Sequence, residues 1–160
     1  MPTNSYRRCA ETGCPTLVGK HEYCDLHKRT ANRYVLYVDA SITQNPGGAM
    51  RFGWVLYDPL GRVIVTERGY LAGERRTVNE AELGAIRMGL EYFLENHRGE
   101  DLVCYSDSKI ALAWVRKRPE ILELMAGAAG KIVFKQVSRD DNTFADNLAS
   151  RRRPSRTVIQ

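Results

Sequence analysis

Alternating apolar and polar positions mark three strands in the first half of the chain. They cover residues 34–39, 52–57 and 62–70, which are rich in β-branched and aromatic side chains. Turn-forming residues at 44–48 and 58–61 separate the three stretches. Because such short connections join antiparallel neighbours, the pattern predicts three consecutive antiparallel strands.

The hydrophobic period changes in the second half of the chain. Between residues 77 and 96, apolar side chains recur every three to four positions, which predicts an amphipathic helix packed on a sheet. The later elements are a strand at 102–106, helical pieces at 108–114 and 120–129, a strand at 131–137 and a last helix after residue 142. The predicted order of elements is therefore βββαβαβα.

Carboxylates follow or begin several of these elements. Asp39 stands where the apolar run of the first strand ends, and Asp107 follows the strand at 102–106. Asp39 could bind a cation, or it could open a solvated turn. Glu80 and Glu82 lie in the first turns of the long helix, where the helix dipole alone favours acids. Because these two residues are two positions apart, at most one of them can face Asp39.

Composition and charge narrow the class of protein. With 160 residues, 43% hydrophobic and 27% charged, the chain fits one domain with a small appendage. It lacks a membrane-spanning run and a signal-peptide core, so we expect a cytoplasmic protein. The net charge of +5 lies on the flanks, where residues 1–33 hold six Lys/Arg against three acids and residues 151–160 hold four Arg and no acid. Such flanks suit a nucleic acid, although a merely soluble surface would look similar.

Three cysteines and a histidine cluster near the N-terminus as Cys9-x4-Cys14-x9-Cys24-x2-His27. In a reducing compartment such clustering indicates metal ligation more often than a disulfide. Four ligands would close a tetrahedral shell, so the spacing predicts a structural zinc knuckle. The alternative is a set of reduced, unligated thiols. We accordingly divide the chain into a zinc-knuckle-like segment at 1–30, a main domain at 34–152 and a basic, disordered tail at 153–160.

Four motifs, taken together, resemble the ribonuclease H family. They are Asp39-Ala40-Ser41 with Asn45-Pro46-Gly47, then Asn79-Glu80-Ala81-Glu82-Leu83, then Tyr105-Ser106-Asp107-Ser108, and finally Asn142-x2-Ala145-Asp146-x-Leu148-Ala149. Any one of them alone would be a weak signal. The resemblance covers residues 34 to about 152 and implies a ribonuclease H-like fold, with a five-stranded mixed sheet flanked by helices.

The resemblance also implies a function and its residues. The family cleaves the RNA strand of RNA–DNA hybrids and leaves 5′-phosphate and 3′-hydroxyl ends. Its catalytic and metal-binding carboxylates correspond here to Asp39, Glu82, Asp107 and Asp146. They would hold two Mg²⁺ or Mn²⁺ ions, with Asp39 bridging both.

The same resemblance places residues against the nucleic acid. Asn45 and Asn79 would contact the minor groove and the 2′-hydroxyl groups of the hybrid, and Thr77 would hold a phosphate of the DNA strand. We place Arg139 with them. Beyond the hybrid we expect no membrane partner and no organic cofactor, and we expect a monomer.

The chain departs from the family pattern at several positions. Ala40 replaces a glycine and Val78 a frequent asparagine, and the loop before the last helix has Arg139 and no histidine. We therefore expect slower or more metal-sensitive catalysis, not inactivity. A long basic handle is also missing, and 116–118 is a brief basic substitute. Two alternatives stay open: another nuclease of the same superfamily, or a non-catalytic module that binds hybrids or RNA.

Overall fold

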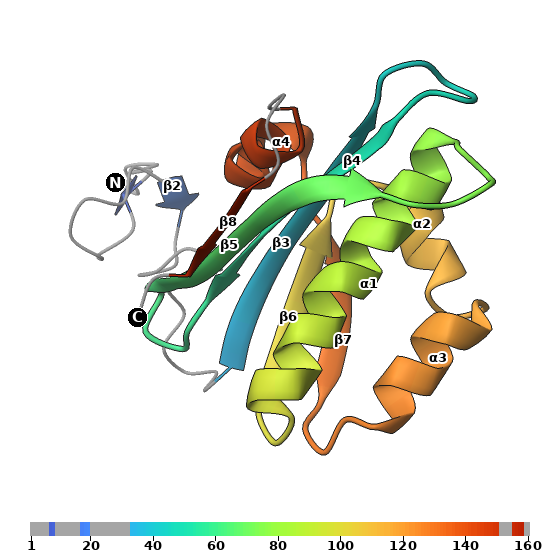
Figure 1. Ribbon diagram of the computed structural model, residues 1–160. Helices are drawn as coiled ribbons and strands as arrows, with labels where there is room; N and C mark the ends of the chain where they lie inside the picture. The colour runs from blue at the N-terminus through green and yellow to red at the C-terminus, as the bar shows by residue number, and fades with distance from the viewer. Residues whose placement is uncertain (1–6, 9–16, 20–32, 151–154, 159–160) are drawn as a thin grey trace.

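A mixed sheet forms the centre of the protein. The computed structural model describes residues 7–8, 17–19, 33–150 and 155–158 of the chain. In this part of the chain, one sheet has six strands in the order β7-β6-β3-β4-β5-β8, and the short strands β1 and β2 pair separately. Figure 1 shows the long helix α1 crossing the front of the large sheet.

The large sheet combines an antiparallel half and a parallel half. Its strands are β3 (Arg33–Ile42), β4 (Met50–Tyr57), β5 (Val63–Leu71), β6 (Asp101–Ser106), β7 (Ile132–Gln136) and β8 (Ser155–Val158). β3, β4 and β5 pair antiparallel in chain order, as the sequence predicted. β6 joins β3 in parallel, and β7 joins β6 in parallel. The ribonuclease H-like architecture expected from the motifs is confirmed.

The helices follow the predicted segments closely. They are α1 (Val78–His97), α2 (Lys109–Trp114), α3 (Pro119–Ala126) and α4 (Thr143–Ser150), with a 3-10 turn η2 (Arg139–Asp141) before α4. The hydroxyl of Thr77 caps α1 by accepting a hydrogen bond from the Glu80 N–H at 3.2 Å. This cap satisfies one of the free amides at the helix start. None of the described helices is long and apolar enough to cross a membrane.

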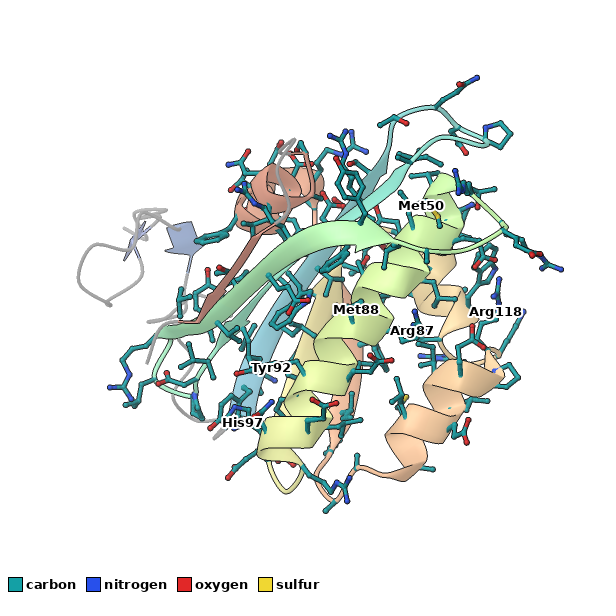
Figure 2. The ribbon with its side chains drawn as sticks, in the orientation of Figure 1. Met50, Arg87, Met88, Tyr92, His97 and Arg118 are labelled. Atoms are coloured by element: carbon teal, nitrogen blue, oxygen red, sulfur yellow. The ribbon has the colours of Figure 1, made fainter. Side chains whose placement is uncertain are left out.

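Most of the core lies between the sheet and α1. Trp54 and Leu36 of the sheet and Leu90 and Phe93 of α1 are fully buried there. The Trp54 ring lies 5.2 Å from the ring of Tyr92, which Figure 2 labels on α1. Buried residues of α2 and α3 belong to the same core, so these helices cover the same face of the sheet.

Helix α4 covers the opposite face. Successive strand residues point to opposite faces, so Gly53 faces away from the core that holds Trp54. A Cβ at Gly53 would lie 2.5 Å from Leu148 Cβ and 2.7 Å from the Ala145 carbonyl oxygen of α4. Ser41 also donates a hydrogen bond to the Ala149 carbonyl at 2.8 Å. The glycine thus allows α4 to pack closely on β4, next to the paired Asp39 of β3.

Two expectations from the sequence are corrected. Residues 155–158, predicted to belong to a disordered tail, form β8 and pair antiparallel with β5. The outer edge of β5 offers unpaired backbone groups that this segment satisfies, which gives the sheet a sixth strand. The first strand also continues past Asp39 to Ile42, because β4 pairs with it along this whole stretch.

The predicted zinc ligands lie outside the described residues. These are Cys9, Cys14, Cys24 and His27. The described strands β1 (Arg7–Arg8) and β2 (Leu17–Gly19) pair antiparallel. In the sequence, Cys9 and Cys14 fall between these two strands.

Candidate active site

Asp39 lies where one neighbouring strand of β3 ends and the other continues. On one side it pairs with Gly53 of β4. On the other side, the last parallel pair with β6 joins Tyr37 to Tyr105. Continuing that register by two residues brings Asp107, which directly follows β6, opposite Asp39. The parallel register therefore places two predicted acids at the same edge.

Glu82 brings the third carboxylate from α1. Asp39 is only 4% exposed and Glu82 only 6% exposed, while Asp107 is partly buried. One carboxylate oxygen from each of the three residues lies within 4.8 Å of the others. Glu80, two positions earlier, instead forms an ion pair with Arg118. The two helix-start acids thus face different sides, and Glu82 is the one that reaches Asp39.

The cluster is electrostatically costly when all its acids are ionised. Burial, a side-chain hydrogen bond with Asp146 and repulsion by Asp107 together raise the pKa of Asp39 to about 7. Burial, followed by the charge of Asp39, raises the pKa of Glu82 to about 10. Both shifts favour the protonated acid, because buried like charges repel one another in a medium of low dielectric constant. A cation would relieve the same repulsion.

Two oxygens of the cluster lack partners in the described part of the chain. Glu82 Oε2 and Asp107 Oδ2 are buried there without a hydrogen-bond partner. Buried acceptors are normally satisfied, and a carboxylate oxygen left without a donor is a ready ligand for a hard divalent cation. The donor set and its unsatisfied oxygens therefore fit a divalent metal ion such as Mg²⁺.

Asp146 lies beside the three-acid cluster. It belongs to the first turn of α4 and is near enough to Asp39 to raise the pKa of that acid through a shared proton, although it is not one of the three mutually close acids. A hydrogen bond between two carboxyl groups requires a proton on one of them, which is why it raises the pKa of Asp39. The structure therefore brings all four predicted acids together around Asp39.

Asn142 fixes α4 against the central strand. This residue is 1% exposed, and its Nδ2 donates to the Val38 carbonyl oxygen at 2.8 Å. The Asn142 carbonyl in turn accepts from the Asp146 N–H at 3.0 Å. The sequence marked Asn142 only as part of a motif, and its contact with Val38 could not be foreseen, since 104 residues separate the two.

The predicted nucleic-acid contacts gather at the start of α1. Asn45 Oδ1 accepts a hydrogen bond from the Val78 N–H at 3.3 Å, and the Gly47 N–H donates to the Arg76 carbonyl at 2.7 Å. The 44–48 loop is thereby held against Thr77 and the residues after it. Asn79 lies in the first turn of α1, half-buried.

Arg139 comes from a different part of the fold. It is exposed in η2, the 3-10 turn that precedes α4. As expected from the sequence, it lies in the loop before the last helix, on the segment that leads to Asp146. Arg139 therefore precedes, by seven residues in the sequence, the acid that α4 adds to the cluster.

Similar structures include ribonucleases H. The RNase H1 of the halophilic archaeon Halobacterium salinarum NRC-1 is 28% identical, covers 72% of this chain and 93% of its own, and gives a TM-score of 0.63. LC11-RNase H1, solved in complex with an RNA/DNA hybrid, is 22% identical with the same coverage and a TM-score of 0.60. The PFV RNase H domain is 18% identical, covers 74% and 93%, and gives a TM-score of 0.56. The last two likenesses show the fold alone.

Two family models match different, overlapping parts of the chain. No curated protein sequence matches it. A family described as a domain of unknown function (DUF8602) matches residues 1–45, and this match does not bear on zinc. A second family, described as reverse transcriptase-like, matches residues 37–152, which include all four acids of the candidate site. Since this match spans most of the chain and agrees with its ribonuclease H-like fold, the protein belongs to the reverse transcriptase-like family.

Proposed function

We propose that the protein is a metal-dependent endoribonuclease that hydrolyses the RNA strand of RNA–DNA hybrids and leaves 5′-phosphate and 3′-hydroxyl ends. The observation that carries this proposal is the buried cluster of Asp39, Glu82 and Asp107, whose oxygens lie within 4.8 Å of one another. The family membership and the likeness to ribonucleases H1, one of them solved with an RNA/DNA hybrid, support the same activity.

Two Mg²⁺ or Mn²⁺ ions would be held by Asp39, Glu82, Asp107 and Asp146. When bound, such ions activate the attacking water and stabilise the leaving oxygen in phosphodiester hydrolysis. We assign Asp39 the central place because each of the other three acids influences its pKa. Its place inside a strand paired with β4 keeps the carboxylate fixed while the other three approach from α1, the end of β6 and α4.

The start of α1 would recognise the hybrid. Asn45 already uses Oδ1 to accept from Val78, so we assign its Nδ2 to the minor groove. The Thr77 hydroxyl accepts from Glu80 and keeps its own O–H for a phosphate of the DNA strand. Asn79 lies in the same turn, and Arg139 would add a contact with a phosphate from the other side of the site.

The N-terminal segment would add a structural zinc site. We propose Cys9, Cys14, Cys24 and His27 as its four ligands. They lie in the segment at 1–30, which we treat as separate from the 34–152 domain and from the tail at 153–160. Its basic residues, such as Arg7 and Arg8, would add affinity for the polyanionic hybrid.

Cleavage of matched substrates tests the proposed activity. Labelled RNA–DNA hybrid, double-stranded RNA, double-stranded DNA and single-stranded RNA are incubated with Mg²⁺ or Mn²⁺ and the wild-type protein, Asp39→Asn or Asp140→Asn. Asp140 is an exposed acid of η2 and provides the same chemical change outside the cluster. We expect cutting of the RNA strand of the hybrid, retained in Asp140→Asn and lost in Asp39→Asn.

The other outcomes identify the alternatives. Metal-dependent cutting of another nucleic acid, without cutting of the hybrid, would assign the protein to a different nuclease activity of the superfamily. Binding of the hybrid without metal-dependent cutting would make it a non-catalytic binding module.

A further inference from the structure

Arg118 connects the three helices on the α1 face of the sheet. It is the N-cap residue of α3, and its backbone N–H donates to the carbonyl of Trp114, the last residue of α2, at 2.9 Å. Its side chain pairs with Glu80 of α1, and Figure 2 labels Arg118 near α3. The guanidinium group is therefore the side-chain link between α3 and the start of α1.

The contact with α1 is a two-pronged ion pair. Arg118 Nη2 binds Glu80 Oε1, and Arg118 Nη1 lies 3.3 Å from Glu80 Oε2. The Arg118 Cζ lies 4.7 Å from the centroid of the Trp114 ring, and Nη1 also lies 3.6 Å from Glu120 Oε1. Paired N–H···O bonds and a stacked aromatic ring fix both the position and the plane of a guanidinium group.

The environment of this pair distinguishes it from an ordinary surface ion pair. The side chain of Arg118 is 26% exposed and that of Glu80 is 17% exposed. By contrast, Arg87 and Glu91 of the same helix lie 4.0 Å apart and are 42% and 39% exposed. Exposed pairs of that kind contribute little, whereas partly buried, two-pronged pairs hold a defined geometry.

Glu80 is placed to determine the direction of Glu82. In the capping pattern Thr77-x-x-Glu80, the glutamate side chain would ordinarily turn back to the N-cap amide. Here it binds Arg118 on the α3 side, while the Glu80 N–H still donates to Thr77. Two residues later the helix has turned to the opposite side, where Glu82 meets Asp39. The first turn of α1 is thus held on one side by Arg118 and presents its metal-facing acid on the other.

We infer that Arg118 is a positioning residue for the metal site, acting through Glu80 on the first turn of α1 and so on Glu82. The inference rests on the proposed function, since it assigns the acid cluster to metal binding. It also changes the part expected of the basic segment 116–118, because Arg118 is engaged within the protein. Arg116 and Lys117 are exposed and remain available for phosphates.

The test compares metal binding with hybrid binding. Mn²⁺ is titrated into the full chain while the electron paramagnetic resonance signal of free Mn²⁺ is followed, and binding that remains in Asp39→Asn is subtracted. We expect roughly ten-fold weaker Mn²⁺ binding in Arg118→Ala, as for the loss of an outer-shell partner of a metal site. Arg118→Lys keeps the charge but not the planar fork, so its loss should be intermediate. Glu80→Gln should weaken binding in the same direction.

Two control variants test whether weaker Mn²⁺ binding in Arg118→Ala comes from a misplaced Glu82, and not from the loss of an ion pair of α1 or of a positive charge. Arg87→Ala removes the exposed ion pair of the same helix and should leave Mn²⁺ affinity unchanged. Arg116→Ala should weaken hybrid binding without changing Mn²⁺ affinity. In cleavage assays, Arg118→Ala should raise the Mg²⁺ concentration needed for half-maximal rate, leave KM for the hybrid unchanged and recover activity at high Mg²⁺. Melting temperatures show whether each variant is folded.

Each result decides between the two proposals. Wild-type Mn²⁺ affinity in folded Arg118→Lys and Glu80→Gln would overturn the positioning role, whatever the nuclease activity. A wild-type protein that binds no Mn²⁺ at Asp39 would also overturn it. If the wild type binds Mn²⁺ but cuts no hybrid, the proposed activity fails, and weaker binding in the Arg118 variants would still support the positioning role.

Discussion

The amide of Asn142 donates a hydrogen bond to the carbonyl of Val38, the residue before Asp39, across 104 positions of sequence. The donor directly precedes α4, which carries Asp146, and the acceptor belongs to β3, which carries Asp39. This buried contact therefore helps to hold the helix of Asp146 beside the strand of Asp39. It links the packing of α4 to the chemistry of the cluster.

Replacement of Asn142 should cost both stability and metal binding. Asn142→Ala leaves the Val38 carbonyl without its side-chain donor, and we expect a loss of about 1–3 kcal/mol in the free energy of unfolding, measured by urea denaturation. Mn²⁺ binding should weaken as well, because Asp146 loses its fixed place. Asn147→Ala, at an exposed position of the same helix, is the control and should change neither. Equal stability of the two variants would show that the bond contributes nothing net.

The metal-free protein should become less stable as the pH rises. The pKa of Asp39 is about 7 in the folded protein against an ordinary value of 3.8, so the folded state binds more protons than the unfolded state between these values. The stabilisation is present below pH 4 and is lost as the pH rises through 7. One pKa unit corresponds to about 1.4 kcal/mol, which gives a loss of up to about 4 kcal/mol over this window. The raised pKa of Glu82 extends the decline above pH 7.

Urea denaturation in a chelator, from pH 4.5 to 8.5, measures this decline. Asp39→Asn should flatten it and should be more stable than the wild type at pH 8, since one buried charge is removed. Addition of Mg²⁺ should stabilise the wild type most at high pH, where the acids are ionised and can bind it. Stability of the metal-free wild type that rises between pH 5 and 8 would contradict the electrostatic account.

A methyl group at Gly53 should disrupt the packing of α4. In Gly53→Ala the new Cβ would lie 2.5 Å from Leu148 Cβ and 2.6 Å from the Ala149 nitrogen, so helix or strand must shift. We expect a loss of about 1–3 kcal/mol in the free energy of unfolding, as for overpacked cores. Gly99→Ala is the control, because a Cβ there meets nothing within 4 Å. A Gly53→Ala variant as stable as Gly99→Ala would mean that α4 packs less closely than the structure shows.

The N-terminal segment should carry about one zinc per chain. Metal analysis of the purified protein should find this zinc, and Cys24→Ser should reduce the zinc content because a structural site needs all four ligands to close its shell. Cys104→Ala is the matched control, since Cys104 is a buried thiol of β6. A zinc-free wild type would contradict the zinc site and favour the alternative, in which these side chains bind no metal.

Local patterns were sufficient where an element depends on its own residues. The alternation of β3, β4 and β5 and the helical period of α1 correctly predicted these elements, because each buries one face or stripe and its sequence shows that periodicity. The turn at 58–61 was also correct: Asp58 accepts hydrogen bonds from the Leu60 and Arg62 amides, each at 2.9 Å.

Local patterns could not predict the edge strand β8 or choose between the two acids at the start of α1. The tail segment 155–158 reads as basic and polar, and only the open edge of β5 makes it a strand. Local chemistry did not distinguish Glu80 from Glu82, since both favour a helix start, and only the resemblance to the ribonuclease H motif pointed to Glu82. The structure places Glu80 against Arg118 of α3 and Glu82 beside Asp39.

The sequence by itself determined the order of the elements, the acids at their ends and the motifs that resemble a ribonuclease H. It could do so because periodicity and turn chemistry act over a few residues. Only the tertiary structure decided that Asp107 follows β6 opposite Asp39, that Asn142 before α4 binds Val38 of β3, and that Arg118 pairs with Glu80. These relationships join residues 38 to 104 positions apart, and they depend on strand register and close packing, which no local pattern contains.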